Sequence, residues 1–377
     1  MIRNLLCGFV GIGCAAAATP HTLVEWSFDR TEAKEQMRAF NHLADVRVEN
    51  GALHARLANW DPFVVPPRFR IPATPYQQVE IRLKTDQGGK AELFWTDTTE
   101  TPYGGFTSGQ STPFEIQGDD RWHVYRIRPF WHHLDHIILI RLDFPAPAES
   151  HYGKKHAAID WIRIVDPGPP DQIVTIPEWR FPAHAAHWTA AGATNVSSDT
   201  TGLALQAEPA SRPTLEGPAL NVPVQDRFWV SLEMKVSAGR TGTIQWVSSE
   251  HRGLHSRPFP LTADGAFHVY NLDMTAEREW TGNLLHLALQ PVNQEGAGAV
   301  VRKIAVTDSP HGPADVRCPY VGSVESMPRV GNPLTLQLRL VNRGGTAATN
   351  LRIAELELPD GVSLRAQPGW KALPPLE

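Results

Sequence analysis

Hydrophobic and polar residues alternate along much of this chain. In residues 79–84 (VEIRLK) every second side chain is apolar, and residues 230–235 (VSLEMK) repeat the alternation in the same phase. A period of two is typical of a β-strand that buries one face. Because a slip of one residue would turn the apolar set to solvent, the shared phase predicts that both segments hold the same place in two similar sheets.

The likeness between the two halves of the chain extends beyond this strand. Further segments recur in the same order, and a repeat of this length indicates duplicated domains and not a solenoid of small units. We therefore predict an all-β chain that contains two tandem β-sandwiches. The matching pairs are 24–28 with 177–181, 92–95 with 243–246, 122–127 with 267–272, and 162–166 with 304–308.

Segments rich in proline and glycine divide the chain into domains. Residues 167–170 (PGPP) and 309–313 (SPHGP) interrupt any regular element and mark linkers. The two expected sandwiches occupy residues 22–167 and 172–310.

A third segment, residues 316–377, continues the β pattern. Leucines alternate with polar residues in 334–341, and residues 342–345 (NRGG) and 359–362 (PDGV) have the composition of turns. About 60 residues is short for a sandwich, which typically needs roughly 100. We therefore expect that either the chain has been cut or the domain is incomplete, and the sequence leaves open whether the native chain continues beyond Glu377.

The composition favours strands over long helices and excludes two classes of partner. The chain has 12 Trp, 32 Pro and 29 Gly, which fits strands joined by many turns. A net charge of −5 at pH 7 gives no long-range attraction for nucleic acid or anionic lipid. A neutral partner fits this charge better.

The N-terminus predicts export. Residues 1–18 have the pattern of a secretory signal peptide, with Arg3 before an apolar run at 5–12 that is too short to span a bilayer. We expect a secreted, periplasmic or cell-surface protein, and lipidation at Cys14 stays an alternative. After cleavage only Cys318 remains, so the domains have no internal disulfide.

Two loops of the first copy are the best candidates for ligand binding. Residues 96–106 (TDTTETPYGGF) lie in a connection that is longer than its counterpart in the second copy, and residues 59–63 (NWDPF) form the second loop. Binding residues collect on loops, and small-ligand sites combine apolar faces with a few polar groups. An ordinary surface loop is the alternative reading of each segment. The candidate carbohydrate-binding residues are Trp60, Asp61, Trp95, Asp97, Tyr103, Phe106 and Trp131.

Several of these residues have an alternative structural role. Trp95 shares a strand face with apolar neighbours and recurs in the second copy as Trp246, so packing in the core competes with sugar stacking. His123 and His268 also occupy one shared position, and their alternation with the tyrosines that follow places them on the inner face of a sheet. We predict that these histidines are structural.

Metal chemistry has weaker support. His133, Asp135 and His136 resemble part of the zinc motif of the metallo-β-lactamase family, but Trp131 stands where that family has its first His. We therefore predict a polar loop before a buried strand. No cofactor is expected other than a structural Ca²⁺, which Asp160 could help to hold. Paired carboxylates, a phosphate loop and a nucleophile elbow do not stand out, so no catalytic residue is assigned.

Each copy resembles the galactose-binding-like jelly-roll modules, of the carbohydrate-binding-module type, that accompany secreted bacterial polysaccharide-degrading enzymes. The likeness rests on Trp26 and Phe28, the Trp95 strand, residues 122–125 (WHVY) and the closing residues 159–164 (IDWIRI). The resemblance implies a jelly-roll fold and glycan binding. The second copy departs from it at Lys303, which replaces Trp161, and in its shorter loop.

Residues 326–365 resemble the start of the Ig-like domains found beside glycosidase and adhesion modules, where such domains are spacers. Together these patterns favour a non-catalytic carbohydrate-binding region of a secreted polysaccharide-active protein, whose candidate partners are a glycan and a C-terminal catalytic domain in a longer chain. Two alternatives stay open: a glycoside hydrolase or lyase whose catalytic site lies in a jelly roll or in a missing domain, and a structural surface or adhesion protein.

Overall fold

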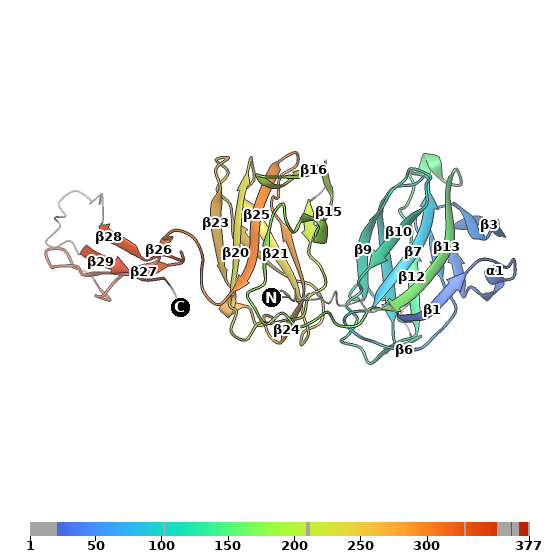
Figure 1. Ribbon diagram of the computed structural model, residues 1–377, viewed down its shortest axis with the longest axis horizontal. Helices are drawn as coiled ribbons and strands as arrows, with labels where there is room; N and C mark the ends of the chain where they lie inside the picture. Colours follow the sequence, from blue (N-terminus) through green and yellow to red (C-terminus); the bar gives the residue numbers. More distant parts are fainter. Residues whose placement is uncertain are drawn as a thin grey trace, which may run out of the picture. The chain divides into compact units, whose positions relative to one another are not determined.

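The computed structural model describes residues 21–100, 103–208, 212–327, 329–352, 363 and 369–375. Antiparallel strands make up most of the described chain (Figure 1), and its one α-helix, α1 (Ala33–Gln36), has four residues. The all-β fold class is thereby confirmed. The chain separates into two compact units, Met1–Pro169 and Pro170–Glu377. The expected signal peptide lies outside the described residues.

The first unit contains a sandwich of two main sheets, which we name after their central strands. The β7 sheet has the order β10 (His123–Ile127), β7 (Gln78–Thr85), β13 (Lys155–Asp166), β4 (Ala52–Leu57), β3 (Leu43–Glu49), with β1 (His21–Ser27) also paired to β13. The β12 sheet has the order β2 (Ala39–Asn41), β5 (Phe63–Val65), β12 (Leu139–Asp143), β8 (Gly89–Thr96), β9 (Ser111–Ile116). A short pair, β6 (Ile71–Pro72) with β11 (His136–Ile137), adds to them.

The second unit repeats this arrangement strand for strand. The β20 sheet has the order β16 (Ala193–Asp199), β17 (Gly202–Ala207), β25 (Gly298–Thr307), β20 (Trp229–Val236), β23 (His268–Asp273), with β14 (Glu178–Arg180) paired to β25. The β24 sheet has the order β15 (Thr189–Ala191), β18 (Thr214–Glu216), β24 (Asn283–Gln290), β21 (Thr241–Ser248), β22 (His255–Pro260), with β19 (Val222–Pro223) paired to β24. The two halves are therefore copies of one sandwich.

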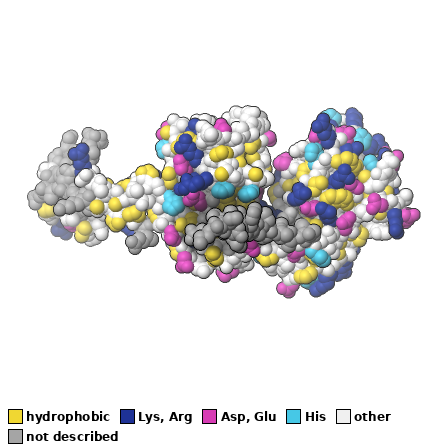
Figure 2. Space-filling view, viewed as in Figure 1, with side chains coloured by type: hydrophobic (Ala, Val, Ile, Leu, Met, Phe, Trp, Pro, Cys, Tyr) yellow, Lys and Arg dark blue, Asp and Glu magenta, His cyan; other side chains and the backbone are white. Residues whose placement is uncertain are grey.

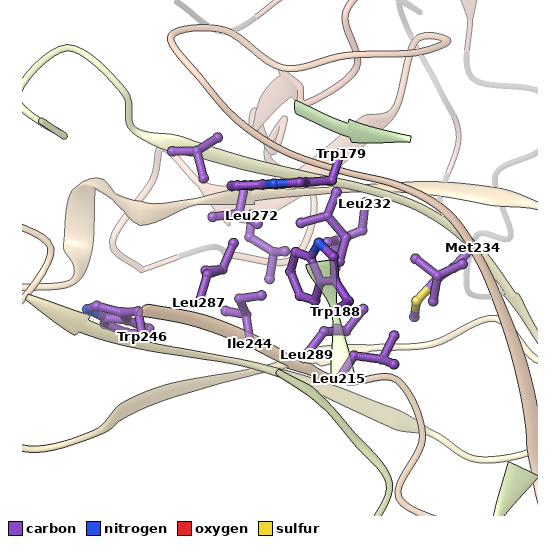
Figure 3. Close-up of a cluster of buried hydrophobic side chains, with 14 of the residues drawn as sticks. Trp179, Trp188, Leu215, Leu232, Met234, Ile244, Trp246, Leu272, Leu287 and Leu289 are labelled. Carbon is purple, nitrogen blue, oxygen red and sulfur yellow. The ribbon is translucent and has the colours of Figure 1, made fainter. Parts of the chain in front are cut away.

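Each core is built around a matching pair of tryptophans. Trp95 and Trp131 pack edge to face with ring centres 6.1 Å apart, and Trp246 and Trp280 do the same at 5.6 Å. In the second core, Trp246 belongs to a cluster of buried apolar side chains from both sheets, which includes Leu232 and Leu287 (Figure 3). Burial of large aromatic side chains dominates the stability of such a core, which explains why both copies keep them.

The third segment forms two small antiparallel sheets. Strand β26 (Val316–Ser323) pairs with β27 (Leu336–Asn342), and β28 (Ala348–Arg352) pairs with β29 (Gly369–Leu373). Their strands agree with the expected β pattern, while an Ig-like identity stays a prediction. The turn expected at 359–362 lies outside the described residues.

Throughout the described ranges, no helix combines the length and the apolar character that crossing a membrane requires.

Candidate functional site

The outward face of the β12 sheet carries a cluster of polar and aromatic side chains. Strand β8 turns Leu93 and Trp95 into the core, so the alternate residue Phe94 faces outward. Strand β12 likewise buries Leu142 and turns Arg141 outward. Because side chains alternate across a strand, the residues that build the core also fix those on this face.

Arg141 lies at the centre of this face among three phenylalanines. Its guanidinium carbon is 4.3 Å from the ring centre of Phe63, 4.6 Å from that of Phe94 and 5.8 Å from that of Phe106. These distances allow cation–π attraction. The Arg141 Nε also donates to Asp143 Oδ1 at 2.6 Å, and Nη2 donates to Oδ2 at 2.5 Å. We call these five residues the Arg141 cluster.

Two further acidic residues border the Arg141 cluster. Asp143 pairs across the sheet with Glu92, and like charges in directly opposite positions destabilise a sheet. Burial raises the pKa of Asp143, the hydrogen bond from Arg141 opposes this rise, and the charges of Asp61 and Glu92 add to it. The Glu92 Oε1 accepts a hydrogen bond from Ser111 Oγ at 2.6 Å. The face is therefore rich in acceptors.

The loop expected at residues 96–106 folds back over one end of this face. Gly105 has φ +93°, and a Cβ there would lie 2.2 Å from the carbonyl oxygen of Thr98. Only glycine fits this conformation and this approach, which brings Phe106 against Arg141. Tyr103 projects from the loop and is 83 % exposed. Residues 101 and 102 lie outside the described ranges.

A second exposed aromatic residue lies beyond the other end of β12. Phe63 pairs with Asp143 at the end of β12, whereas Thr96 pairs with Leu139 at its start. The loop before Phe63 and the loop after Thr96 therefore lie at opposite ends of this strand. Trp60, in the former loop, is 65 % exposed. Exposed aromatic side chains thus flank the Arg141 cluster at both ends.

The structure separates the predicted binding residues into two groups. Trp95 and Trp131 are 3 % and 0 % exposed, and a ring buried in the core offers no face to a sugar, so the site is built without them. Phe106 is 8 % exposed and packs within the Arg141 cluster. Trp60 and Tyr103 are exposed, as a ligand-binding residue requires.

The remaining predicted residues lie in the loops at the two ends of the face. Asp97 is partly exposed in the loop that follows β8. The carbonyl oxygen of Asp61 accepts a hydrogen bond from Asn41 Nδ2 at 2.6 Å, which ties the Trp60 loop to strand β2.

Sequence reasoning missed Phe94, Arg141, Asp143 and Glu92. The signal was present, because these residues alternate with the apolar residues of strands that the sequence already indicated. Sequence analysis selected Trp95 and passed over its neighbour Phe94, which faces the opposite side of the sheet.

The second sandwich lacks the Arg141 cluster at the matching positions. Gln245 and Ala288 face each other there as Phe94 and Arg141 do in the first sandwich. Thr243 and Gln290 likewise replace Glu92 and Asp143. Thr214 Oγ1 accepts a hydrogen bond from Gln290 Nε2 at 3.3 Å, and on the same face Nε2 of His286 lies 2.8 Å from Oε2 of Glu216. Only the first copy carries these acidic and aromatic residues.

The residue expected to help hold a Ca²⁺, Asp160, has a different partner in the structure. The carboxylate of Asp160 forms an ion pair with Arg82, which competes with a Ca²⁺ ligand role. Across the described ranges, no three or more His, Cys, Asp or Glu side chains are grouped so that they could hold a metal ion. A structural Ca²⁺ stays a prediction, and the site proposed here does not use it.

The shared histidines form the same contact in both copies. Nε2 of His123 lies 2.9 Å from Oδ1 of Asp119, and Nε2 of His268 lies 2.9 Å from Oδ1 of Asp264. The hydrogen bond to the histidine is the main cause that lowers the pKa of each aspartate. Both copies keep this contact, although the outward faces of their β12 and β24 sheets differ. Such a contact fits a structural role.

The outward face of the β7 sheet, on the opposite side of the first sandwich, is a network of paired charges. Glu80 is 6 % exposed and forms ion pairs with Arg126 and Arg163. Arg82 and Lys84 lie 5.1 and 5.5 Å from the ring centre of Trp122. On the face shown in Figure 2, Lys and Arg side chains are interspersed with Asp and Glu. This pattern is typical of a solvated, charge-balanced surface.

Known proteins show only distant similarity to this chain. No protein-family model and no curated protein sequence matches the chain. Among solved structures, the N-terminal CBM22-1–CBM22-2 tandem domain of Paenibacillus barcinonensis Xyn10C has 12 % identity, covers 78 % of this chain and 99 % of its own, and has a TM-score of 0.24.

Two single modules give similar values. The xylan-binding module CBM15 has 14 % identity over 35 % of this chain and 95 % of its own, with a TM-score of 0.27. A carbohydrate-binding module of Cellvibrio mixtus lichenase 5A, in complex with cellotriose, has 12 % identity over 39 % and 98 %, with a TM-score of 0.26. TM-scores this low do not support a statement about function, so only the residues of this chain can support one.

Proposed function

We propose that the first sandwich binds a polysaccharide chain on the outward face of its β12 sheet. Half-buried Phe63 and Phe94 offer ring surface to the apolar face of a sugar, and the exposed Trp60 and Tyr103 extend this surface toward both ends of β12. Aromatic surface combined with a few convergent polar groups is the usual composition of a small-ligand site.

The polar groups of this face favour sugar hydroxyls as partners. The carboxylates of Asp61, Glu92 and Asp143 accept hydrogen bonds, whereas a single guanidinium, that of Arg141, donates them and already bonds to Asp143. Hydroxyls can donate to carboxylates in hydrogen bonds that are stronger than neutral ones. The excess of acidic groups would repel a uronate or sulfate.

The observation that carries this proposal is the difference between the two copies. Both sandwiches keep the same strand order and the same tryptophan pair in the core, yet only the first has Phe94, Arg141 and the opposed acids. If these residues served only the stability of the sandwich, we would expect both copies to have them. The added residues of the first copy therefore support a ligand-binding role.

In this proposal the remaining modules have supporting roles. The second sandwich is a structural partner, and the third segment is an Ig-like spacer toward a catalytic domain in a longer chain. The signal-like N-terminus supports a secreted or cell-surface location. The protein then acts as a non-catalytic, polysaccharide-targeting region.

The test is binding of the full chain to a panel of soluble polysaccharides, by affinity electrophoresis and calorimetry. Phe94→Gln and Arg141→Ala install the residues of the second copy, and the matched control is Gln245→Ala in the second sandwich. We expect each change in the first sandwich to weaken binding about tenfold, as the loss of one aromatic contact does. Binding unchanged by both substitutions would refute the site.

A hydrolase or lyase on the same face is the second candidate. The opposed Asp143 and Glu92, with burial raising the pKa of Asp143, are the features that favour it. Incubation with each bound polysaccharide followed by reducing-end and unsaturated-product assays decides between the two. Released products that vanish with Asp143→Asn would support an enzyme, and an intact polysaccharide supports the binding role.

A further inference from the structure

The linker at residues 309–313 is attached to the second sandwich by the side chain of Asn271. Asn271 Oδ1 accepts hydrogen bonds from the His311 backbone N–H at 3.0 Å and from Ser231 Oγ at 2.5 Å. Its Nδ2 donates to the carbonyl oxygens of His311 and Arg343, both at 2.8 Å. One amide on strand β23 therefore holds the linker and the turn of the third segment together.

Two glycines allow that turn, residues 342–345, to lie against the linker. A Cβ on Gly344 would lie 1.9 Å from the carbonyl oxygen of Pro313, and one on Gly345 would lie 2.7 Å from that of Pro310. The Gly345 N–H donates to the carbonyl oxygen of Gly312 at 3.1 Å. The pair of glycines is thus required by close contact between the two segments.

The imidazole of His311 adds a charged contact to this attachment. Its Nδ1 lies 3.2 Å from Nζ of Lys303 on strand β25. A lysine ammonium has only donors, so Nδ1 must accept, and it can do so only while the imidazole is neutral. Protonation would remove the acceptor and place two positive charges against each other.

The surrounding charges do not cancel this repulsion. Glu178 and Arg180 on strand β14 and Asp308, just before the linker, also act on His311, but Arg180 forms an ion pair with Glu178. Burial, followed by the charge of Lys303, lowers the pKa of His311 below its ordinary 6.5. A lowered folded-state pKa means that the contact is intact above pH 6.5 and is lost as the pH falls through the lowered value.

We propose that Lys303, His311, Asn271 and Arg343 form an acid-sensitive latch, in which neutral His311 keeps the linker and the turn at 342–345 on the second sandwich and protonated His311 releases them. Release would free the third segment to move relative to the sandwich. The first copy lacks the device, because Trp161 stands where the second has Lys303.

The test is amide hydrogen exchange in the full chain between about pH 7.5 and pH 5, corrected for the intrinsic pH dependence of exchange. We expect exchange of the His311 and Gly345 amides to accelerate about tenfold on acidification, as the loss of a charge-assisted hydrogen bond would cause. The amides of strand β20 should stay protected, which shows that the sandwich itself remains folded.

Two variants identify the residues responsible. His311→Gln should abolish the acceleration, while His187→Gln, outside the linker, should leave it intact. Lys303→Gln should reduce the acceleration, because it removes the repulsion that favours release, and should move the midpoint to higher pH, because His311 then protonates more easily. The latch is overturned if the step persists in His311→Gln, if the wild type shows no step, or if Lys303→Gln leaves the midpoint unchanged. If His311→Gln exchanges rapidly at every pH, that variant does not show whether the acceleration has been lost. The midpoint measured in Lys303→Gln then decides whether the latch exists.

Discussion

At the scale of single residues, the first sandwich keeps an arrangement that its own stability does not favour. Asp143 and Glu92 face each other across the β12 sheet; Asp143 forms an ion pair with Arg141, whereas Glu92 accepts a hydrogen bond from the neutral Ser111 hydroxyl. Neighbouring strands with opposed like charges lose stability. A ligand whose hydroxyls bond to both carboxylates would offset this repulsion.

Glu92→Gln should therefore stabilise the protein and weaken glycan binding together. We expect a gain of roughly 0.5 kcal/mol in the free energy of unfolding at neutral pH, measured by urea denaturation. Glu115→Gln on strand β9 is the matched control, because Glu115 lies opposite Lys90 and its loss should bring no gain. Lower stability of Glu92→Gln, with binding intact, would show that the carboxylate serves the fold.

We expect a buried aromatic residue to contribute to stability and an exposed one to contribute to binding. Trp95→Ala should lower the free energy of unfolding by about 3–5 kcal/mol, the usual loss for a buried aromatic. Tyr103→Ala should change it by less than about 0.5 kcal/mol and weaken polysaccharide binding. Denaturation curves and calorimetry on both variants check this division. Tyr103→Ala with unchanged affinity would remove the loop from the site.

At the scale of elements, the loop after β8 is fixed by one glycine. Gly105→Ala should cost about 1–3 kcal/mol, because its φ is +93° and the new Cβ would meet the Thr98 carbonyl. Gly104→Ala is the control: φ is +68°, but a Cβ there meets nothing within 4 Å, so about 1 kcal/mol is expected. Binding should fall in Gly105→Ala, since Phe106 must move. Equal costs in both variants would contradict the close contact.

The connections from β9 to β10 and from β22 to β23, which contain Asp119 and Asp264, predict a pH dependence of stability. The pKa values of Asp119 and Asp264 are lowered, so each carboxylate stabilises the folded state above its ordinary pKa and loses this effect as the pH falls through the lowered value. Asp119→Asn and Asp264→Asn should each lower stability near pH 6 and converge with the wild type in acid. Denaturation at several pH values measures this. A difference that grows in acid would contradict it.

At the scale of the whole molecule, the sequence allowed the duplication to be predicted but not the binding face. Paired segments such as 79–84 and 230–235 share a phase because the same core selects the same apolar residues in both copies. Residues on the outward face follow no such rule. Phe94 and Arg141 become one cluster only when strands β8 and β12 pair, a contact between segments far apart in the chain.

The same limit applies to the aromatic residues. A tryptophan in an alternating strand fits the core as well as a sugar platform, and the sequence does not distinguish the two sides without the sheet. Trp95 and Trp131 proved to belong to the core, whereas loop residues Trp60 and Tyr103 are exposed because no strand partner covers them.

The most direct test of the central claim is a hydrogen-exchange footprint of the full chain with and without a bound oligosaccharide. The account predicts slower exchange at residues 59–65, 92–111 and 139–143 of the first sandwich. The matching segments of the second, Thr241–Ser248 and Asn283–Gln290, should be unchanged. Protection of both sandwiches alike, or of the β7 sheet alone, would contradict the assignment of glycan binding to the first copy's β12 sheet.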